Sequence, residues 1–164
     1  MRLAGRALAL LLLVTTVGCD RVTKQLASTH LAQKPTQSYF ADTLRLEFAQ
    51  NSGAFLSMGS QLPEAVRFAL FRVGVGIALL ALLGVALKRR WSGALLAGAT
   101  LIFAGGMSNL IDRIIHGSVV DFASIGIGAL RTGIFNIADV AILLGGVLMV
   151  VGSTEHQKRS VQNG

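Results

Sequence analysis

Apolar residues occur along the chain in four long blocks, separated by shorter and more polar stretches. The blocks extend over residues 7–27, 65–87, 93–111 and 134–152. Each is close to the roughly 20 residues that an α-helix needs to cross the hydrocarbon core of a bilayer. Glycine and alanine recur in the last three blocks, and small residues let membrane helices approach each other closely. The pattern predicts an all-α integral membrane protein built as a bundle of four transmembrane helices.

A different periodicity appears between the first two blocks. In residues 43–50, "TLRLEFAQ", apolar and polar positions alternate, which is the period of a half-buried β-strand. The strand leads into Asn51-Ser52-Gly53, a combination typical of turns. We therefore expect a small extracytoplasmic β-sheet cradle at the membrane surface. The whole of residues 1–164 is expected to form a single membrane-embedded domain.

Composition supports the membrane assignment. Of the 164 residues, 52% are hydrophobic and only 14% are charged, whereas globular proteins carry about 25% charged residues. The net charge of +7 does not point to nucleic acid, because no basic run is interleaved with aromatic residues. Basic residues instead mark the ends of the blocks, where they set orientation. They are Arg2, Arg6, Lys88, Arg89, Arg90, Lys158 and Arg159.

This charge pattern predicts a topology. With four spans, the three basic groups share one side of the membrane, which should be cytoplasmic. Both termini then lie in the cytoplasm, and the segments 28–64 and 112–133 face outward. Four spans of this length also place the protein in contact with membrane lipid.

The residues that usually hold metals are scarce. The single cysteine, Cys19, excludes an internal disulfide and a cysteine-cluster metal site. The three histidines, His30, His116 and His156, are far apart and lack metal-ligand spacing. We therefore expect no metal or cofactor. Cys19 has no histidine near it in sequence, so we interpret it as a small apolar residue in the core and not as a nucleophile.

The first block also resembles a lipoprotein signal peptide. It has a basic start, an apolar run and Gly18-Cys19, and cleavage before the cysteine would leave a lipid-anchored, non-catalytic protein. Three further spans follow, however, and Thr16 occupies a position where lipoprotein signals prefer leucine. We interpret the block as a retained helix.

Four aspartates border apolar blocks, where ionisable groups are costly and mark a functional site or a structural ion pair. Asp112 is followed by Arg113, and we expect these two to form an ion pair. Asp20 and Lys24 are four residues apart, on one face of a helix, and are expected to pair likewise.

Asp121 and Asp139 have no cation within four residues in sequence. At the outer ends of neighbouring helices, two such carboxyls can share one proton and supply a general acid and a general base for water attack on a peptide bond. Ordinary helix capping would also explain an aspartate here, especially Asp139. The same residues fit a small transporter or channel subunit with a proton relay, or a structural bundle protein in which these aspartates tolerate replacement.

Five short motifs along the chain, taken in order, match those of a known protein family. They are "DRVTK" (20–24), "NSGAF" (51–55), "GGMSNLIDR" (105–113), "GSVVDF" (117–122) and "FNIAD" (135–139). Together they resemble lipoprotein signal peptidase (signal peptidase II), the bacterial intramembrane aspartic peptidase family, over nearly the whole chain. The glycine-rich linker at residues 123–133 lacks the aromatic residues of many family members.

The resemblance implies the fold, the reaction and the site. The fold is four transmembrane helices with an outward β-rich cradle and a short outer helix. The reaction removes signal peptides from diacylglyceryl-modified prolipoproteins, on the N-terminal side of the lipidated cysteine. The catalytic dyad corresponds to Asp121 and Asp139. The substrate-binding or supporting positions correspond to Asp20, Lys24, Asn51, Gly53, Asn109, Asp112, Arg113, Asn136 and Ala138. Within that mechanism, Asn109 and Asn136 would position the aspartates and Asn51 would contact the substrate backbone.

Overall fold

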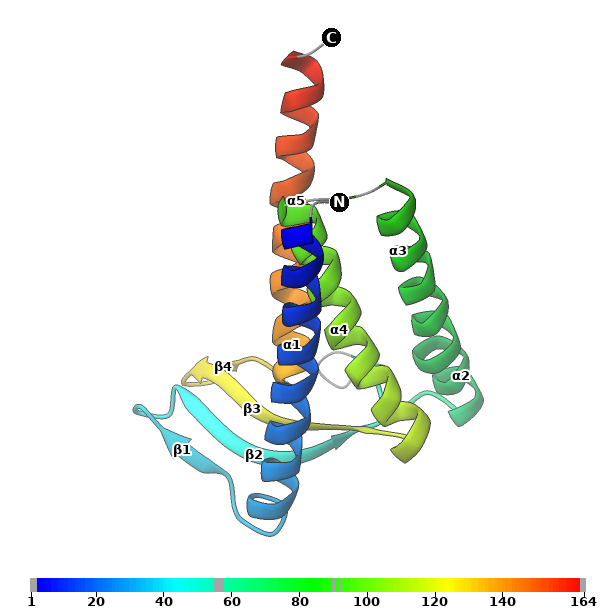
Figure 1. The fold of residues 1–164 in the computed structure, drawn as a ribbon. Helices are drawn as coiled ribbons and strands as arrows, with labels where there is room; N and C mark the ends of the chain where they lie inside the picture. Colours follow the sequence, from blue (N-terminus) through cyan, green and yellow to red (C-terminus); the bar gives the residue numbers. More distant parts are fainter. Residues whose placement is uncertain (1–2, 55–57, 90, 92, 163–164) are drawn as a thin grey trace.

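The computed structural model describes residues 3–54, 58–89, 91 and 93–162, the last eight of these by their backbone alone. Arg2, Phe55 and Arg90, which enter the interpretation of the sequence, lie outside these ranges. Long helices stand side by side, and a small sheet lies across one end of them (Figure 1). Both termini lie toward the opposite end, and the last turns of the C-terminal helix extend beyond the other helices (Figure 1).

Within the described residues, four helical stretches are long and apolar enough to cross a membrane, as the sequence pattern predicts. The first is α1 (Leu3–His30), and the second combines α2 (Glu64–Phe68), a π-helical turn η2 (Ala69–Gly74) and α3 (Val75–Arg89). The third is α4 (Gly93–His116), and the fourth is the membrane-spanning part, Ile137–Thr154, of α5 (Ile137–Gln162). The chain is therefore a multi-pass membrane protein.

Among the helix ends that differ from the prediction, two lie at the site. Helix α4 continues to His116, so that Asp112 belongs to the helix and not to the loop after it. The helix ends where Gly117, at a φ of 75°, adopts the left-handed conformation that glycine tolerates. The fourth helix begins at Ile137, three residues later than the apolar block, because Asn136 caps it.

The sheet is antiparallel, in the order β1-β2-β3-β4. Its strands are β1 (Gln37–Tyr39), β2 (Leu44–Asn51), β3 (Val119–Ile127) and β4 (Leu130–Arg131). Strand β2 confirms the strand predicted from alternation. The linker at residues 123–133 is part of the β3–β4 hairpin, which turns at Gly128 with a φ of 57°. Between β2 and α2, the described residues 58–61 form turns and contain no separate helix.

Helices α4 and α5 approach each other most closely at glycines. A Cβ atom added to Gly145 would lie 2.6 Å from the carbonyl oxygen of Gly98, and the reverse addition gives the same distance. One heptad further along α5, at Gly152, an added Cβ would lie 2.8 Å from the backbone nitrogen of Leu95. The small residues in these blocks therefore allow backbone contact between the helices. Gly105 of α4 approaches the backbone of Ala138 in the same way, which holds the start of α5 against α4.

We expect Gly145→Ala to destabilise the bundle, although alanine favours a helix over glycine by about 1 kcal/mol. The added methyl group meets backbone atoms of α4, which cannot move aside without separating the helices. Gly146→Ala is the matched control, because a Cβ atom there meets nothing within 4 Å. Thermal unfolding in detergent should show a lower midpoint for Gly145→Ala only. Equal midpoints for the two variants would contradict this packing.

Candidate active site

Asp121 lies on β3 and not at the end of a helix. Alternate residues of this strand are buried, and Val119, Asp121 and Ala123 share the face that points toward the helices. In the pairing of β2 with β3, Ala49 is opposite Asp121 and Asn51 is opposite Val119. Asn51 and Asp121 are thus diagonal neighbours on one face of the sheet. The Asn51 amide Nδ2 donates to Asp121 Oδ2 at 2.8 Å.

Asp139 lies in the first turn of α5, within a reciprocal cap. Its backbone N–H donates to Asn136 Oδ1 at 3.0 Å, and the N–H of Asn136 donates to Asp139 Oδ2 at 3.2 Å. This arrangement is a capping box, which satisfies amide groups that the helix itself cannot. Capping and a catalytic role are therefore compatible for Asp139, because its Oδ1 accepts from Asn109 and not from the cap.

Asn136 connects the two aspartates. Its side-chain Nδ2 donates to Asp121 Oδ1 at 2.6 Å, while its backbone and Oδ1 form the cap with Asp139. The backbone also ties the strand to the helix, since Phe135 N–H donates to the carbonyl of Ala123 at 2.8 Å. Both carboxyls are nearly fully buried, at 1% exposure for Asp121 and 7% for Asp139.

A compact ion cluster lies beside the aspartate pair. Lys24 Nζ is 2.6 Å from Asp20 Oδ2 and 2.7 Å from Asp112 Oδ2, so the predicted Asp20–Lys24 pair is present. Lys24 also donates to Asn109 Oδ1 at 2.7 Å. An amide whose oxygen accepts a hydrogen bond must direct its nitrogen the other way, and Asn109 Nδ2 donates to Asp139 Oδ1 at 2.9 Å. Lys24 therefore fixes the orientation of the amide that holds Asp139.

The expected ion pair between Asp112 and Arg113 is wrong. Asp112 pairs with Lys24 and Arg21 on α1, because adjacent residues of a helix point in different directions. Arg113 instead donates to the carbonyl of Gly53 through Nη2, at 2.7 Å, and through Nε, at 3.1 Å. It holds the turn after β2 against α4.

That turn forms as its sequence predicts. Gly53 N–H donates to Asn51 Oδ1 at 2.9 Å, the contact that defines an asparagine turn. Asn51 Nδ2 is shared between the carbonyl of Ala54, at 2.8 Å, and Asp121. In this structure Asn51 therefore orients Asp121.

Two residues of the cluster were missed from sequence. Ser108, fully buried, donates to Asp20 Oδ2 at 2.7 Å, and Arg21 bonds to Asp112 and to the Ser108 carbonyl. Both residues lie inside the family motifs quoted above, and membership of a motif is the sequence feature that could have identified them. Ala138 contributes through its backbone N–H, which donates to Asp20 Oδ1 at 2.9 Å. Cys19 is exposed on α1, which corrects its interpretation as a core residue.

The environment of Asp121 favours its protonated form. Burial raises the pKa of Asp121 to about 6, and the nearby Asp139 carboxyl adds to the increase. The hydrogen bonds from Asn51 and Asn136 oppose it, because they stabilise the carboxylate. Among the described residues, no group of three or more histidine, cysteine or acidic side chains is arranged to hold a metal ion.

This pKa predicts a pH dependence of stability. Between pH 4 and pH 6 the folded protein keeps a proton on Asp121 that the unfolded chain, with a pKa of 3.8, has released. Stability should therefore fall as the pH rises through this range, by roughly 3 kcal/mol for this group. Asp121→Asn should lack this contribution. Unfolding midpoints measured from pH 4 to pH 7 for both proteins check it, and parallel curves would contradict the shift.

The comparison with known families decides the assignment. The family model described as "Signal peptidase (SPase) II" matches residues 12–154, a range that contains all five motifs. The chain belongs to the signal peptidase II family. Signal peptidase II is an aspartic peptidase, so this chain is a hydrolase, and its interpretation as a transporter, a lipoprotein or a structural protein is set aside.

Two curated proteins and one solved structure are similar to this chain over most of its length. The lipoprotein signal peptidase of Chlorobium phaeobacteroides (strain DSM 266) is 36% identical, over 87% of this chain and 88% of its own length. The lipoprotein signal peptidase of Desulforapulum autotrophicum is 35% identical, over 88% of this chain and 91% of its own length. A solved bacterial membrane enzyme is similar in structure, with a TM-score of 0.80 and 27% identity, covering 92% of this chain and 90% of that one.

Proposed function

We propose that this signal peptidase II cleaves diacylglyceryl-modified prolipoproteins on the N-terminal side of the lipidated cysteine, with Asp121 and Asp139 activating the attacking water. The observation that carries the proposal is the pair of buried carboxyls bridged by Asn136. Neither carboxyl is in an ion pair among the described residues, unlike Asp20 and Asp112. One proton shared between them leaves one carboxyl as acid and the other as base.

The reaction then proceeds by general acid–base catalysis. The ionised carboxylate takes a proton from water, and the water oxygen attacks the carbonyl carbon of the scissile bond. The protonated partner donates to the carbonyl oxygen. When the C–N bond breaks, the carboxyl that took the proton from water gives it to the departing amine. A hydroxyl of the intermediate returns a proton to the partner carboxylate, and the signal peptide leaves with a carboxyl end. No metal or organic cofactor takes part in these steps.

The surrounding polar residues are positioning groups in this proposal. Asn51 and Asn136 each occupy one oxygen of Asp121, and Asn109 holds one oxygen of Asp139. Lys24, held by Asp20 and Asp112, in turn donates a hydrogen bond to Asn109. Arg113 and Gly53 keep the turn at the sheet edge close to the dyad. Asn51 remains the residue we propose to meet the substrate backbone.

An apolar groove on α5 matches the apolar part of the proposed substrate. Starting at Asp139, one exposed face of this helix lines a groove of about 590 Å³. Its other lining residues are Ile142, Leu143, Gly146, Val147, Val150 and Val151. We propose that the apolar stretch of the signal peptide lies along this face, with the acyl chains in the bilayer. Proximity of the scissile bond to the dyad then supplies much of the rate.

The proposed orientation places the sheet outside the cell. Both termini and the end of α3 lie opposite the sheet (Figure 1), and the basic groups that flank the apolar blocks, such as Lys88 and Arg89, belong to that end. The termini are therefore assigned to the cytoplasm and the dyad to the outer side of the bacterial inner membrane. A monomer with one membrane-embedded domain suffices for this site.

The function is tested with purified protein in lipid. A diacylated prolipoprotein should be cleaved, and gel mobility and the mass of the product should place the cut before the lipidated cysteine. The same precursor without the diacylglyceryl group is the control and should remain intact. Cleavage of both precursors at equal rates would refute recognition of the lipid, and proton flux without cleavage would refute the peptidase reaction.

A further inference from the structure

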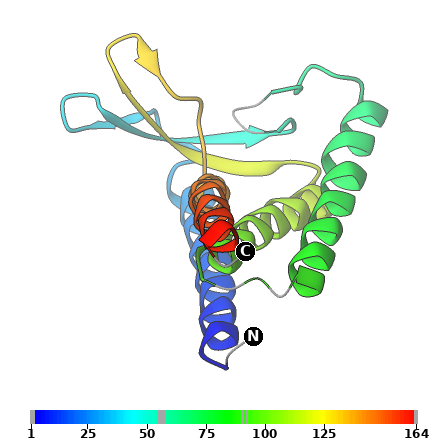
Figure 2. The same ribbon diagram turned by 90° about the horizontal axis from the view of Figure 1, so that it is seen from above.

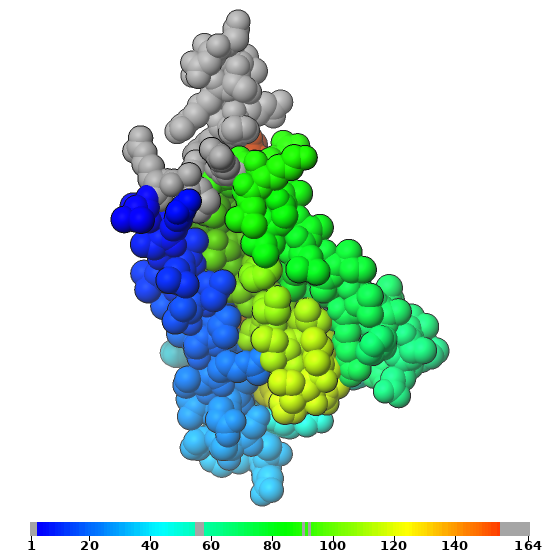
Figure 3. All heavy atoms as spheres, turned by 45° about the vertical axis from the view of Figure 1, so that its right-hand side comes forward, coloured from blue at the N-terminus to red at the C-terminus, as the bar shows by residue number. Residues whose placement is uncertain are grey.

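An apolar groove lies in the bundle far from the aspartates. It opens between α1 and α3, with α4 as its floor, and encloses about 290 Å³. Seen from above, α3 stands apart from α1, and α4 lies between them (Figure 2). The space-filling view shows the same furrow between the surfaces of α1 and α3, toward the end opposite the sheet (Figure 3).

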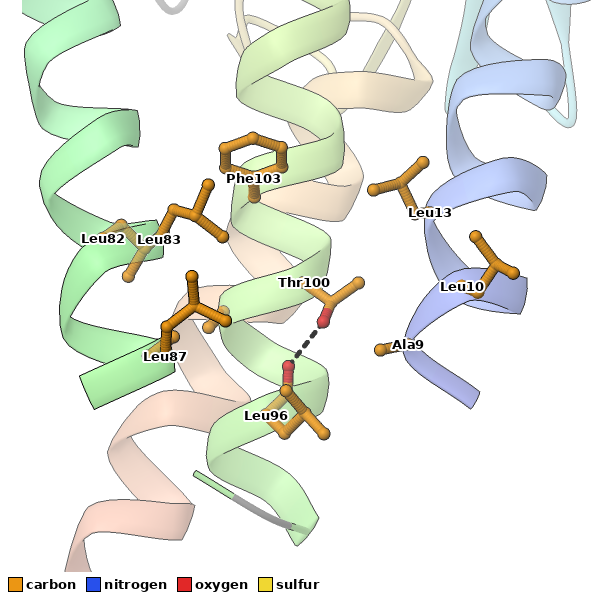
Figure 4. Close-up of a pocket in the computed structure, with 11 residues that line it drawn as sticks. Ala9, Leu10, Leu13, Leu82, Leu83, Leu87, Leu96, Thr100 and Phe103 are labelled. Atoms are coloured by element: carbon orange, nitrogen blue, oxygen red, sulfur yellow. Dashed lines mark hydrogen bonds between the residues drawn. The ribbon is translucent and has the colours of Figure 1, made fainter. Parts of the chain in front are cut away.

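The lining of the groove is aliphatic and aromatic. Leu10 and Leu13 line it from α1, Leu83 from α3 and Phe103 from α4 (Figure 4). Small side chains, such as Ala9 and Ala86, create the hollow. The one hydroxyl in the lining, that of Thr100, donates to the carbonyl of Leu96 at 2.8 Å and so has its partner within α4. The groove thus offers no free hydrogen-bonding group, and an apolar occupant fits it.

The size of the groove selects among apolar occupants. A transmembrane helix is about 10–12 Å wide with its side chains, and a volume of 290 Å³ cannot admit its backbone. A single acyl chain is narrow enough to enter between α1 and α3. The groove lies within the helices that span the membrane, so acyl chains surround it at this depth.

Positive charge at the mouth of the groove adds a headgroup preference. Lys88 and Arg89 directly follow the lining residue Leu87, and Arg6 precedes Ala9 by about one turn of α1. All three basic side chains are exposed. In α1, α3 and α4, the acids nearest to the lining are Asp20 and Asp112, each seven or more residues beyond it. Basic clusters beside pockets between membrane helices bind anionic lipid headgroups.

We propose that this groove is a binding site for one anionic glycerophospholipid of the leaflet opposite the sheet. One acyl chain occupies the groove between α1 and α3. The phosphate-bearing headgroup lies against Arg6, Lys88 and Arg89. The lipid fills the gap that α4 alone leaves open, and it joins α1 to α3 without touching the dyad. The site is independent of the peptidase reaction.

The test is lipid binding by native mass spectrometry of the full chain released from detergent. Phosphatidylglycerol and phosphatidylcholine with identical acyl chains are titrated in parallel. We expect one saturable site that binds phosphatidylglycerol about a hundredfold more tightly, because the three basic residues near the anionic headgroup contribute about 1 kcal/mol each. Equal binding of the two lipids would overturn the headgroup assignment, and a dimer that excludes lipid would overturn the site.

Variants separate the groove from the general lipid-facing surface. Ala86→Phe fills the groove and should weaken phosphatidylglycerol binding at least tenfold, and Ala9→Phe should do the same from the α1 side. Ala78→Phe is the matched control, because Ala78 is exposed on α3 outside the groove. Replacing Arg6, Lys88 and Arg89 together by glutamine should remove the headgroup preference, whereas Lys34→Gln, at the sheet end, should not. Unchanged binding in both groove-filling variants would refute the proposal.

Discussion

Asp121→Asn and Asp139→Asn should each abolish cleavage of a diacylated prolipoprotein. Each substitution keeps the size of the side chain and removes the ability to exchange a proton. Loss of one member of a general acid–base pair costs on the order of 10²–10⁴-fold in rate, and here each aspartate has its own role, one as the base toward water and the other as the acid toward the carbonyl oxygen. Cleavage in both variants should fall below detection in a gel assay.

The same variants should remain folded and inserted. The raised pKa of Asp121 shows that burying its charged carboxylate is unfavourable. Asp121→Asn removes that charge, so this variant should be at least as stable as the parent at pH 7. Asp42→Asn is the control, because Asp42 pairs with Arg45 on the exposed part of the sheet, away from the dyad. Normal cleavage by both dyad variants would refute the assignment. Unfolding of both would show a structural role instead.

Lys24→Met should destabilise the protein strongly. Lys24 is 5% exposed and is the cation shared by Asp20 and Asp112. Removing one partner of a buried ion pair costs about 3–5 kcal/mol, because the remaining charge stays buried without compensation. After the change Asp20 has no cation, while Asp112 keeps Arg21. Unfolding in detergent should show the loss as a lowered midpoint.

A second substitution distinguishes charge from packing. Adding Asp20→Asn to Lys24→Met removes the uncompensated carboxylate and should recover much of the lost stability. Activity should stay low, because Asn109 has lost the donor that fixes its amide toward Asp139. Lys34→Met, at an exposed position, should leave the midpoint unchanged. A double variant less stable than Lys24→Met alone would contradict the electrostatic explanation.

Periodicity in the sequence predicts the helices well because each apolar block is long and the bilayer sets its length. The ends of α4 and α5 depend instead on local geometry, namely the positive φ of Gly117 and the cap made by Asn136. Strand β3 was not predicted, since "VVDFASIGI" has no strict alternation of polar and apolar residues. Its burial on one face comes from pairing with β2, a partner about 70 residues earlier.

In the candidate site, too, contacts within one helix are predictable from the sequence, whereas contacts between elements are not. The i, i+4 spacing of Asp20 and Lys24 predicts their pair, because both belong to one helix. The prediction that Asp112 pairs with the adjacent Arg113 fails, because the cations that contact Asp112 belong to α1, about 90 residues away in sequence. Ser108 and Arg21 escape a search for acids and bases, because their contribution is to hold other groups in place. Only the packing of α1 on α4 brings these residues together.

The hydrogen bond from the Ala138 N–H to Asp20 joins the first membrane helix to the last. During translation α1 leaves the ribosome long before α5, and a chain shorter than 136 residues carries Asp121 without either Asn136 or Asp139. A partly synthesised copy therefore lacks the complete pair of aspartates that we propose as the dyad. Under the proposed mechanism, the enzyme becomes competent only when its final helix inserts, and the order of synthesis then keeps unfinished molecules inactive.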